Sequence, residues 1–363
     1  MLRFIPTLVF ALAAVTPAQA QDTTRLRDGL QVVLDTFRDR YGFPGATAAV
    51  ALPDGTVIGV ATGLADVEAG IAMTSDSRML AAGIGKTFVA ATVLALEGEG
   101  CLSRADGLAD HLGNRAWLGD LPNARTITIA HLLHHTAGLP DLVQLPAFQS
   151  AWVRMATGDA VIAPEDLIGF ATGTEPLFEA GTAWAYSDTG YIRLGLVIKD
   201  VTGAPSEDAV RVRFLDPLML TSTIASDRRN LPNLAVGYVA PDNPFGLPER
   251  TARPDGQLLW NPAVEWTGGG LASTSHDLAL WGHPLFTGAA MEAPYLDRLR
   301  DAVPVSGHGG WIPGDDSSLR HYPDHGATVA FQINSDTDFL DDTRDLAPAL
   351  EAALADLAIK ALR

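Results

Sequence analysis

The chain has 363 residues, of which 47% are hydrophobic and 19% charged, which suffices for one large globular domain or two lobes around a substantial core. Its formal net charge of −18 makes nucleic acid and anionic membrane surfaces poor partners. A single cysteine, Cys101, excludes an internal disulfide. Because free cysteine is usually buried, we expect a packed thiol there rather than a nucleophile.

The first twenty residues have the pattern of a secretory signal peptide. A positive residue, Arg3, precedes a mostly apolar stretch over 4–15, and small residues at 18 and 20 frame a cleavage site. The apolar stretch is too short for a membrane span, and no later segment is long and apolar enough for one. We therefore expect an exported protein, periplasmic or secreted, with residues 21–363 forming a single domain. A retained N-terminal anchor is the alternative.

The N-terminal part of the mature chain predicts a helix and then a hairpin. Residues 24–41 alternate apolar and charged positions at helical spacing. Residues 46–52 and 56–61 have strand character, and the Pro-Asp-Gly sequence between them is typical of a tight turn. Further along, the apolar run 88–96 predicts a buried helix.

The remainder of the chain predicts walls, a second hairpin and a last helix. Two long stretches, 140–164 and 226–265, are rich in Pro, Asn and Gly, and irregular segments of this length are usually site walls or lids. Residues 318–322 and 327–333 predict a hairpin, followed by a helix over 345–362. Strands near both ends around a mainly helical middle predict an α/β fold of α+β layers, with one sheet and an inserted helical lobe.

Lys86, one of only three lysines, opens the apolar run and is the strongest chemical signal. It is either a solvated helix end or a desolvated catalytic amine. A serine three residues earlier would share its helix face, so that the amine could accept the hydroxyl proton. That pair is the Ser-x-x-Lys nucleophile motif. Here Gly83 stands in the serine position.

Four segments follow one another in a recognisable order. They are Met79–Phe88, Thr126–Pro140, Gly181–Tyr191 and, together, Gly268–Thr274 with Gly307–Gly310. Jointly they resemble the serine β-lactamase superfamily, on the branch of class C β-lactamases, D-alanyl-D-alanine carboxypeptidases, D-aminopeptidases and related esterases. The resemblance implies a two-lobe domain with an antiparallel sheet. It also implies hydrolysis of amide or ester bonds through an acyl-serine, with no metal or organic cofactor. The implied substrates are β-lactams, D-amino-acid peptides, small esters or amino-acid amides.

By this resemblance, Lys86 and Tyr186 match the lysine that helps to deprotonate the serine and the tyrosine that relays the proton. A nearby ammonium would favour the phenolate of Tyr186, which suits a general base. Asp188 stands where the family usually has asparagine. An ionised carboxylate accepts hydrogen bonds but donates none. It would hold a substrate carbonyl less well, and a substrate ammonium or Lys86 itself better.

The last segment would line the substrate cleft. His308, Gly309 and Gly310 match the family's third motif, a strand whose glycines let substrate lie against its edge. The resemblance implies that the backbone N–H groups of Trp311 and of residue 83 form the oxyanion hole, which a glycine at 83 would retain.

Gly83 leaves three explanations open. A serine was replaced to trap a complex, the protein is a non-catalytic ligand- or peptidoglycan-binding relative, or a water acts as a weak nucleophile. In each case we expect substrate binding with poor turnover, because loss of such a nucleophile costs on the order of 10⁶ in kcat.

A zinc-dependent hydrolase is the rival class. His131 and His135 are four residues apart on an expected helix, with His134 between them, and could ligate zinc. However, Leu132 occupies the position of the glutamate in His-Glu-x-x-His. The segment also resembles a structural helix end of the superfamily, with Ala137 in place of serine. The oligomeric state stays open.

Overall fold

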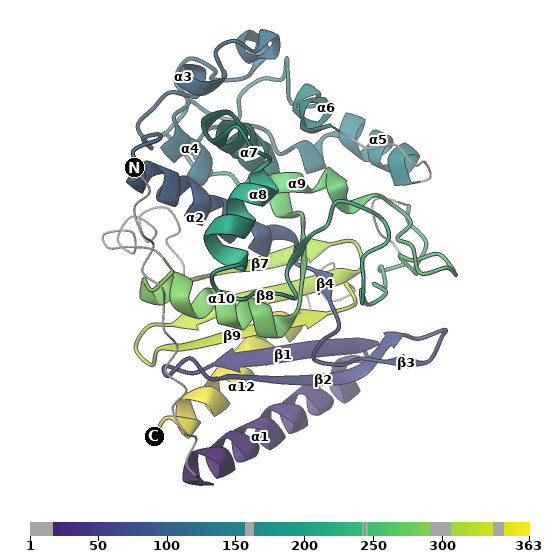
Figure 1. Ribbon diagram of the computed structural model, residues 1–363. Coiled ribbons are helices and arrows are strands. Elements are labelled where there is room, and N and C mark those ends of the chain that lie inside the picture. Colours follow the sequence, from purple (N-terminus) through teal and green to yellow (C-terminus); the bar gives the residue numbers. More distant parts are fainter. Residues whose placement is uncertain (1–16, 157–162, 242, 244–245, 291–305, 337–344) are drawn as a thin grey trace.

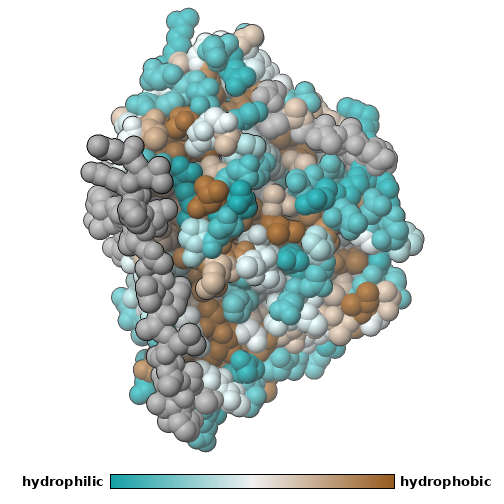
Figure 2. Space-filling view, viewed as in Figure 1, coloured by the Kyte–Doolittle hydropathy of each residue, from teal (hydrophilic) through white to brown (hydrophobic). Residues whose placement is uncertain are grey.

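The computed structural model describes residues 17–363 except 157–162, 242, 244–245, 291–305 and 337–344. A sheet with its covering helices forms the lower part of Figure 1, and a mainly helical lobe forms the upper part. Among the described helices, none combines the length and the apolarity that a bilayer crossing requires. On the face drawn in Figure 2, apolar side chains are interspersed with hydrophilic ones.

The main sheet joins the two ends of the described chain. Its order is β3-β2-β1-β9-β8-β7, and every pairing is antiparallel. The strands are β1 (Gly45–Ala51), β2 (Val57–Asp66), β3 (Ile71–Ala72), β7 (Gly307–Ile312), β8 (Asp315–Tyr322) and β9 (Ala327–Ile333). Both predicted hairpins are confirmed, as β1–β2 and β8–β9. The register places Ala48 opposite Phe331, so an N-terminal and a C-terminal strand form the centre of the sheet.

Helices cover both faces of this centre. α1 (Pro17–Tyr41) and α12 (Leu346–Ala361) pack together on one face, and α10 (Ser275–Thr287) lies on the other (Figure 1). Every residue of β1 and β9 is therefore buried, whereas β2 alternates between buried and partly exposed positions, as expected when one face is less covered. α1 includes residues 17–20, which were assigned to the leader; the cleavage site itself stays a prediction.

The helical lobe is built around α2 (Gly85–Gly98), which is buried over most of its circumference, as expected for a helix that is apolar on all sides. One apolar core connects α2 with α7 and the short helices above them. The other elements of the lobe are α3 (Leu108–Leu112), η2 (Ala116–Asp120), α4 (Ile129–Leu133), η3 (Leu142–Gln144), α5 (Pro146–Ala156), α6 (Pro164–Gly169), α7 (Asp188–Thr202), α8 (Ser206–Val210) and the π-helical η4 (Arg211–Leu215).

Between the lobe and the main sheet lies a small sheet, β4 (Met79–Leu80), β6 (Leu271–Ser273) and β5 (Ile224–Ala225), in the order β4-β6-β5. The short elements η1 (Ala82–Ile84), η5 (Pro262–Val264) and α9 (Trp266–Gly269) flank it in the chain. These elements bring the segment Met79–Phe88 next to the segment Gly268–Thr274.

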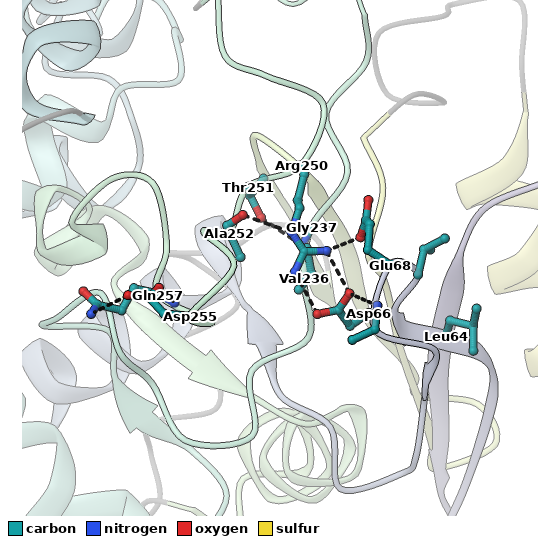
Figure 3. A network of polar contacts seen from close by, with 12 residues as sticks. Leu64, Asp66, Glu68, Val236, Gly237, Arg250, Thr251, Ala252, Asp255 and Gln257 are labelled. Carbon is teal, nitrogen blue, oxygen red and sulfur yellow. Dashed lines mark hydrogen bonds and ion pairs between the residues drawn. The ribbon is translucent and has the colours of Figure 1, made fainter.

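The segment 226–265 is irregular as predicted, apart from η5 at its end. An arginine anchors it to the edge of the main sheet: Arg250 donates to both carboxylate oxygens of Asp66 at 2.8 Å and also contacts Glu68 (Figure 3). The pKa of Asp66 falls to about 2, chiefly because of the hydrogen bond from Arg250. This ion pair holds the long segment in place without regular secondary structure.

Two predictions are wrong. The segment 140–164 is not simply irregular, because it contains η3 and the eleven-residue helix α5. Cys101 is exposed rather than packed: it follows the left-handed Gly100 in the turn that ends α2, so its side chain leaves the core.

Candidate active site

Gly83 and Lys86 lie where the chain enters α2. Gly83 is the middle residue of η1, and Lys86 follows in the first turn of α2. The residue before Gly83, Ala82, has a φ of +45°, a left-handed conformation that carries a cost on the order of 1 kcal/mol for a residue with a side chain. Such strain is found at functional sites more often than elsewhere.

Lys86 is buried and fully engaged. Only 1% of it is exposed, and its Nζ donates to the carboxylate of Asp188 and to the backbone carbonyl of Gly268. Nζ also lies over two aromatic rings, 4.8 Å from the centroid of Tyr186 and 5.5 Å from that of Tyr191. Burial alone would lower the pKa of Lys86, but the charge and hydrogen bond of Asp188 outweigh it and raise the pKa. The amine is therefore held as an ammonium.

Asp188 is the first residue of α7, and Tyr186 lies two residues before it. The hydroxyl of Tyr186 lies 3.5 Å from Oδ1 of Asp188, to which it donates. Burial raises the pKa of Tyr186 more than the charge of Lys86 lowers it. The nearby ammonium favours the phenolate as expected, but burial is the larger effect, so the pKa of Tyr186 is raised overall. Of the two roles predicted for Asp188, the structure contains the contact with Lys86.

The ring of His135 packs against the rings of Tyr186 and Tyr191. Its ring stacks on Tyr186 at 4.6 Å and on Tyr191 at 5.1 Å between centroids. Its Nδ1 accepts the backbone N–H of Ser187 at 3.2 Å, and burial lowers its pKa to about 3. The imidazole is neutral and orients Tyr186.

Strand β7 forms the opposite wall of the site. A Cβ atom on Gly310 would lie 2.2 Å from the carbonyl oxygen of Ala81, so only glycine lets η1 approach β7 this closely. His308 lies on the same strand, and its Nδ1 contacts the carbonyl oxygen of Gly309. Burial and the charge of Lys86 lower the pKa of His308 to about 4, so its ring is neutral.

The space at Gly83 is closed by this wall. An ideal Cβ atom added to Gly83 would lie 2.8 Å from the carbonyl oxygen of Gly309 and 2.9 Å from Cε1 of His308. Ordinary contacts between carbon atoms are about 3.5–4.0 Å. A side chain at position 83 therefore requires β7 or the imidazole to move.

These residues open onto a cavity of about 730 Å³, a size typical of small-molecule sites. Its lining includes Gly83, Lys86, Tyr186, Asp188, His308, Gly309, Gly310 and Trp311. All eight predicted site positions thus meet in one place. Both predicted walls contribute to it as well, the first through Asp141, Val143, Gln144 and Trp152, and the second through Glu265.

Comparison with known proteins agrees with this geometry. A family model described as Beta-lactamase matches residues 30–354. The chain belongs to the beta-lactamase family. The family predicted from the four segments is therefore confirmed, as is the α/β fold with an antiparallel sheet.

Relatives within the beta-lactamase family act in several ways, according to their names. Penicillin-binding protein 4* of Bacillus subtilis is 24% identical over 342 residues, which cover 86% of this chain and 72% of that protein. Esterase EstB of Burkholderia gladioli is 32% identical over 206 residues, 54% of this chain and 51% of the esterase. The crystal structure of D-amino acid amidase from Ochrobactrum anthropi shares the fold, with a TM-score of 0.77, 22% identity and coverage of 93% of this chain and 100% of the amidase.

Two acidic residues of the cavity in this beta-lactamase family member were not singled out from the sequence. Asp141 follows the His-rich segment, and burial together with the charge of Asp188 raises its pKa to about 7. Glu265 precedes α9, and burial and Asp188 raise its pKa to about 8. Neither lies in a recognisable motif. The available signal was their place in the predicted walls, Asp141 near the start of 140–164 and Glu265 at the end of 226–265.

The geometry behind the zinc alternative is absent. α4 ends at Leu133, and His135 has a φ of +57°, so His131 and His135 do not share one helix face. The Nδ1 of His131 accepts the N–H of Thr128, and that of His135 accepts the N–H of Ser187. Within the described ranges, no group of three or more His, Cys, Asp or Glu residues is arranged to hold a metal ion.

Proposed function

We propose that this protein binds small molecules or peptides bearing an amide or ester bond in the cleft of a serine-hydrolase fold, and turns them over poorly because no acyl-enzyme forms. The observation that carries the proposal is the closure at position 83. No hydroxyl is present there, and the place of a Cβ atom is taken by Gly309 and His308.

The state of Lys86 supports the same conclusion. A general base must have a free lone pair, and a buried ammonium that donates to Asp188 and Gly268 has none. The other hydroxyls in the described lining are also occupied. Ser317 donates to backbone carbonyls, and Ser318 donates to Glu351.

The ligand class comes from the relatives. Their names include penicillin-binding proteins, an esterase, a putative D-alanyl-D-alanine carboxypeptidase of Escherichia coli and D-amino acid amidases. These names cover amide and ester chemistry, and they support ligands of that kind without choosing among β-lactams, peptides and esters. We further propose that the protein is exported as a single domain after loss of residues 1–20.

A second candidate is a hydrolase in which only the nucleophile is missing. Lys86, Tyr186 and His308 stand in the family positions and surround Gly83, which is the observation in its favour. In that case the oxyanion hole of residue 83 and Trp311 would also be functional, and serine alone would restore turnover.

The test compares the unaltered chain with Gly83→Ser and Gly83→Ala. The alanine variant adds the same Cβ atom without the hydroxyl, so it separates crowding from nucleophilicity. Each protein is assayed with a chromogenic cephalosporin and p-nitrophenyl esters, and acyl adducts are sought by intact mass. Binding is measured by calorimetry with D-phenylalanine amide.

We expect the unaltered chain to bind without forming an adduct, and Gly83→Ser to remain nearly as inert as Gly83→Ala. Rapid turnover and a covalent adduct in Gly83→Ser alone would favour the second candidate. Rapid turnover by the unaltered chain, or an acyl adduct on it, would overturn the proposal.

A further inference from the structure

The charges that line the cavity do not balance. Its described lining contains two cationic side chains and five carboxyl groups. The cations are Lys86 and Arg320, and the carboxyl groups are those of Asp141, Asp188, Glu265, Asp316 and Glu351. Each cation already has a partner: Lys86 pairs with Asp188, and Arg320 pairs with Glu351 at 3.2 Å. The lining therefore has an excess of acid and no free cation.

Among the acids of the cavity, Glu265 has the least compensated carboxyl group. It is partly buried, and within the described part of the chain its carboxyl group makes no hydrogen bond or ion pair. The residue lies between η5 and α9, directly before the turn whose Gly268 carbonyl accepts from Lys86. A carboxyl group placed in a cavity without a partner is costly unless a ligand supplies the hydrogen bonds.

Asp141, from the other predicted wall, offers a second acceptor in the cavity. Its Oδ1 accepts the backbone N–H groups of Val143 and Asp188, at 3.3 and 3.2 Å, and these bonds fix the side chain. Its Oδ2 accepts no bond from the described residues. Asp141 and Glu265 line the same cavity, one from each predicted wall, and, after burial, the charge of Asp141 is one of the causes that raise the pKa of Glu265.

We propose that the cleft selects ligands with a cationic group, an ammonium or a guanidinium, which binds between the carboxylates of Glu265 and Asp141. This inference rests on the proposed function, because it assumes that the cavity is the ligand site. Charge-assisted hydrogen bonds to two carboxylates would satisfy both acids. The same acids disfavour a ligand carboxylate, so anionic β-lactams and peptides with a free C-terminus in this part of the cleft are poor ligands.

The apolar residues of the lining indicate what the rest of the ligand is. The same cavity is also lined by Trp152, Val143 and Trp311, so it accommodates an apolar or aromatic body together with the cationic group. The ring of Tyr186 is already used by the ammonium of Lys86. The ligand class is thus an amine or guanidine with an apolar body.

Ligand binding is coupled to proton release. At neutral pH both acids are partly protonated, since the pKa values are about 7 for Asp141 and about 8 for Glu265. A bound cation favours their ionised forms, so affinity rises with pH through this range.

The other titratable or charged groups that face these two acids belong to each surrounding element. They are Lys86 of α2, Tyr186 just before α7, Asp188 of α7, His308 of β7, Asp316 and Arg320 of β8, and Glu351 of α12. His308 has its pKa lowered to about 4, and the pKa values of Lys86 and Tyr186 are raised. None of these three groups changes its charge between pH 6 and 9, so the coupling is assigned to Glu265 and Asp141.

The experiment uses three probes with one phenyl ring and different charges: phenethylamine, 2-phenylethanol and 3-phenylpropionate. Calorimetry on the full mature chain at pH 8.5 measures each affinity, and two buffers of different ionisation enthalpy measure protons released at pH 7. The variants are Glu265→Gln and Asp141→Asn. Glu249→Gln, an exposed acid on the same wall outside the cavity, is the matched control.

We expect phenethylamine to bind at least tenfold more tightly than the alcohol, 3-phenylpropionate to bind most weakly, and phenethylamine binding to release protons. Each active-site variant should remove most of the preference for amine over alcohol, while Glu249→Gln keeps it. Equal affinities for amine and alcohol, or a preference that persists in both variants, would overturn the inference while leaving the cleft a ligand site. If none of the probes binds and D-phenylalanine amide does not bind either, the proposed function itself fails.

Discussion

The imidazole of His308 lies against Gly83 so closely that a Cβ atom at position 83 would come within 2.9 Å of its Cε1 atom. The missing serine is therefore more than the loss of one hydroxyl. The wall opposite position 83 has closed over the place where a side chain would stand, and the backbone carbonyl of Gly309 at 2.8 Å closes it further.

The first prediction concerns this contact. Gly83→Ala should lower the free energy of unfolding by about 1–3 kcal/mol, as overpacking does in closed sites. Adding His308→Ala should recover part of the loss and not all of it, because the Gly309 carbonyl remains. Urea denaturation of the four proteins of this double-mutant cycle measures the coupling. Strictly additive effects of the two substitutions would show that the ring does not oppose a side chain at 83.

The second prediction concerns the ion pair between Lys86 and Asp188. Asp188→Asn removes the charge that raises the pKa of Lys86, so burial then lowers the pKa and the amine can act as a base. In a Gly83→Ser background this change should increase acylation by a p-nitrophenyl ester on the order of tenfold or more, since general bases contribute about 10²–10⁴.

The matched control for that comparison is Gly83→Ala with Asp188→Asn, which has the same freed lysine and no hydroxyl. Acyl adducts are counted by intact mass after fixed times. If the serine variants with aspartate and with asparagine at 188 acylate at equal rates, Asp188 does not restrain Lys86.

Most of the main sheet could be predicted, because its signals are local. The hairpin β1–β2 has alternating strand residues around a Pro-Asp-Gly turn, and β8–β9 has a similar turn. Helix α5 was missed because prolines at 140, 146 and 164 suggested irregular structure. Pro146, however, occupies the first position of the helix, where its missing N–H is not needed.

The site could be located from the sequence, but its chemistry depends on burial, which the sequence does not reveal. Tyr186 was expected to ionise more easily beside Lys86, and burial reverses the sign. The acids Asp141 and Glu265 carry no motif, and their raised pKa values result from the tertiary enclosure of the cavity. Motif order thus predicted which residues meet, and only packing determined their protonation.

The third prediction is a pH dependence from the pair of Arg250 and Asp66. Hydrogen bonding to Arg250 lowers the pKa of Asp66 from 3.8 to about 2 in the folded state. A lowered carboxyl pKa contributes stability that is present above about pH 4 and is lost as the pH falls through 2. At about 1.4 kcal/mol per pKa unit the full shift corresponds to roughly 2 kcal/mol, and screening by solvent near the surface reduces the contribution to about 1 kcal/mol.

Arg250→Met should therefore destabilise the protein at pH 5 by more than it does at pH 2.5, as measured by urea unfolding at both values. Arg228→Met is the control, because Arg228 pairs with Asp227 in a largely exposed position and such pairs contribute little. A loss in Arg250→Met that is the same at both pH values would assign its effect to packing rather than to the carboxylate.

The fourth prediction concerns Arg193, which is fully buried in α7. Its Nη1 donates to the carbonyl of Thr189, while Nε and Nη2 have no hydrogen-bond partner among the described residues. Burial lowers its pKa to about 9, which reports the cost of enclosing the charge. The ring of Trp117, 5.8 Å away, compensates only part of this cost.

Arg193→Met keeps a long side chain and removes the buried charge, so it should raise the free energy of unfolding by about 1–3 kcal/mol. Arg193→Lys keeps a charge and loses the planar group, so its free energy of unfolding should not rise. Chemical denaturation measures the free energy of unfolding of the unaltered protein and the two variants, at low and at high chloride concentration. If Arg193→Met is destabilised and chloride stabilises the unaltered protein, a bound anion compensates the guanidinium, and the buried charge carries no net cost.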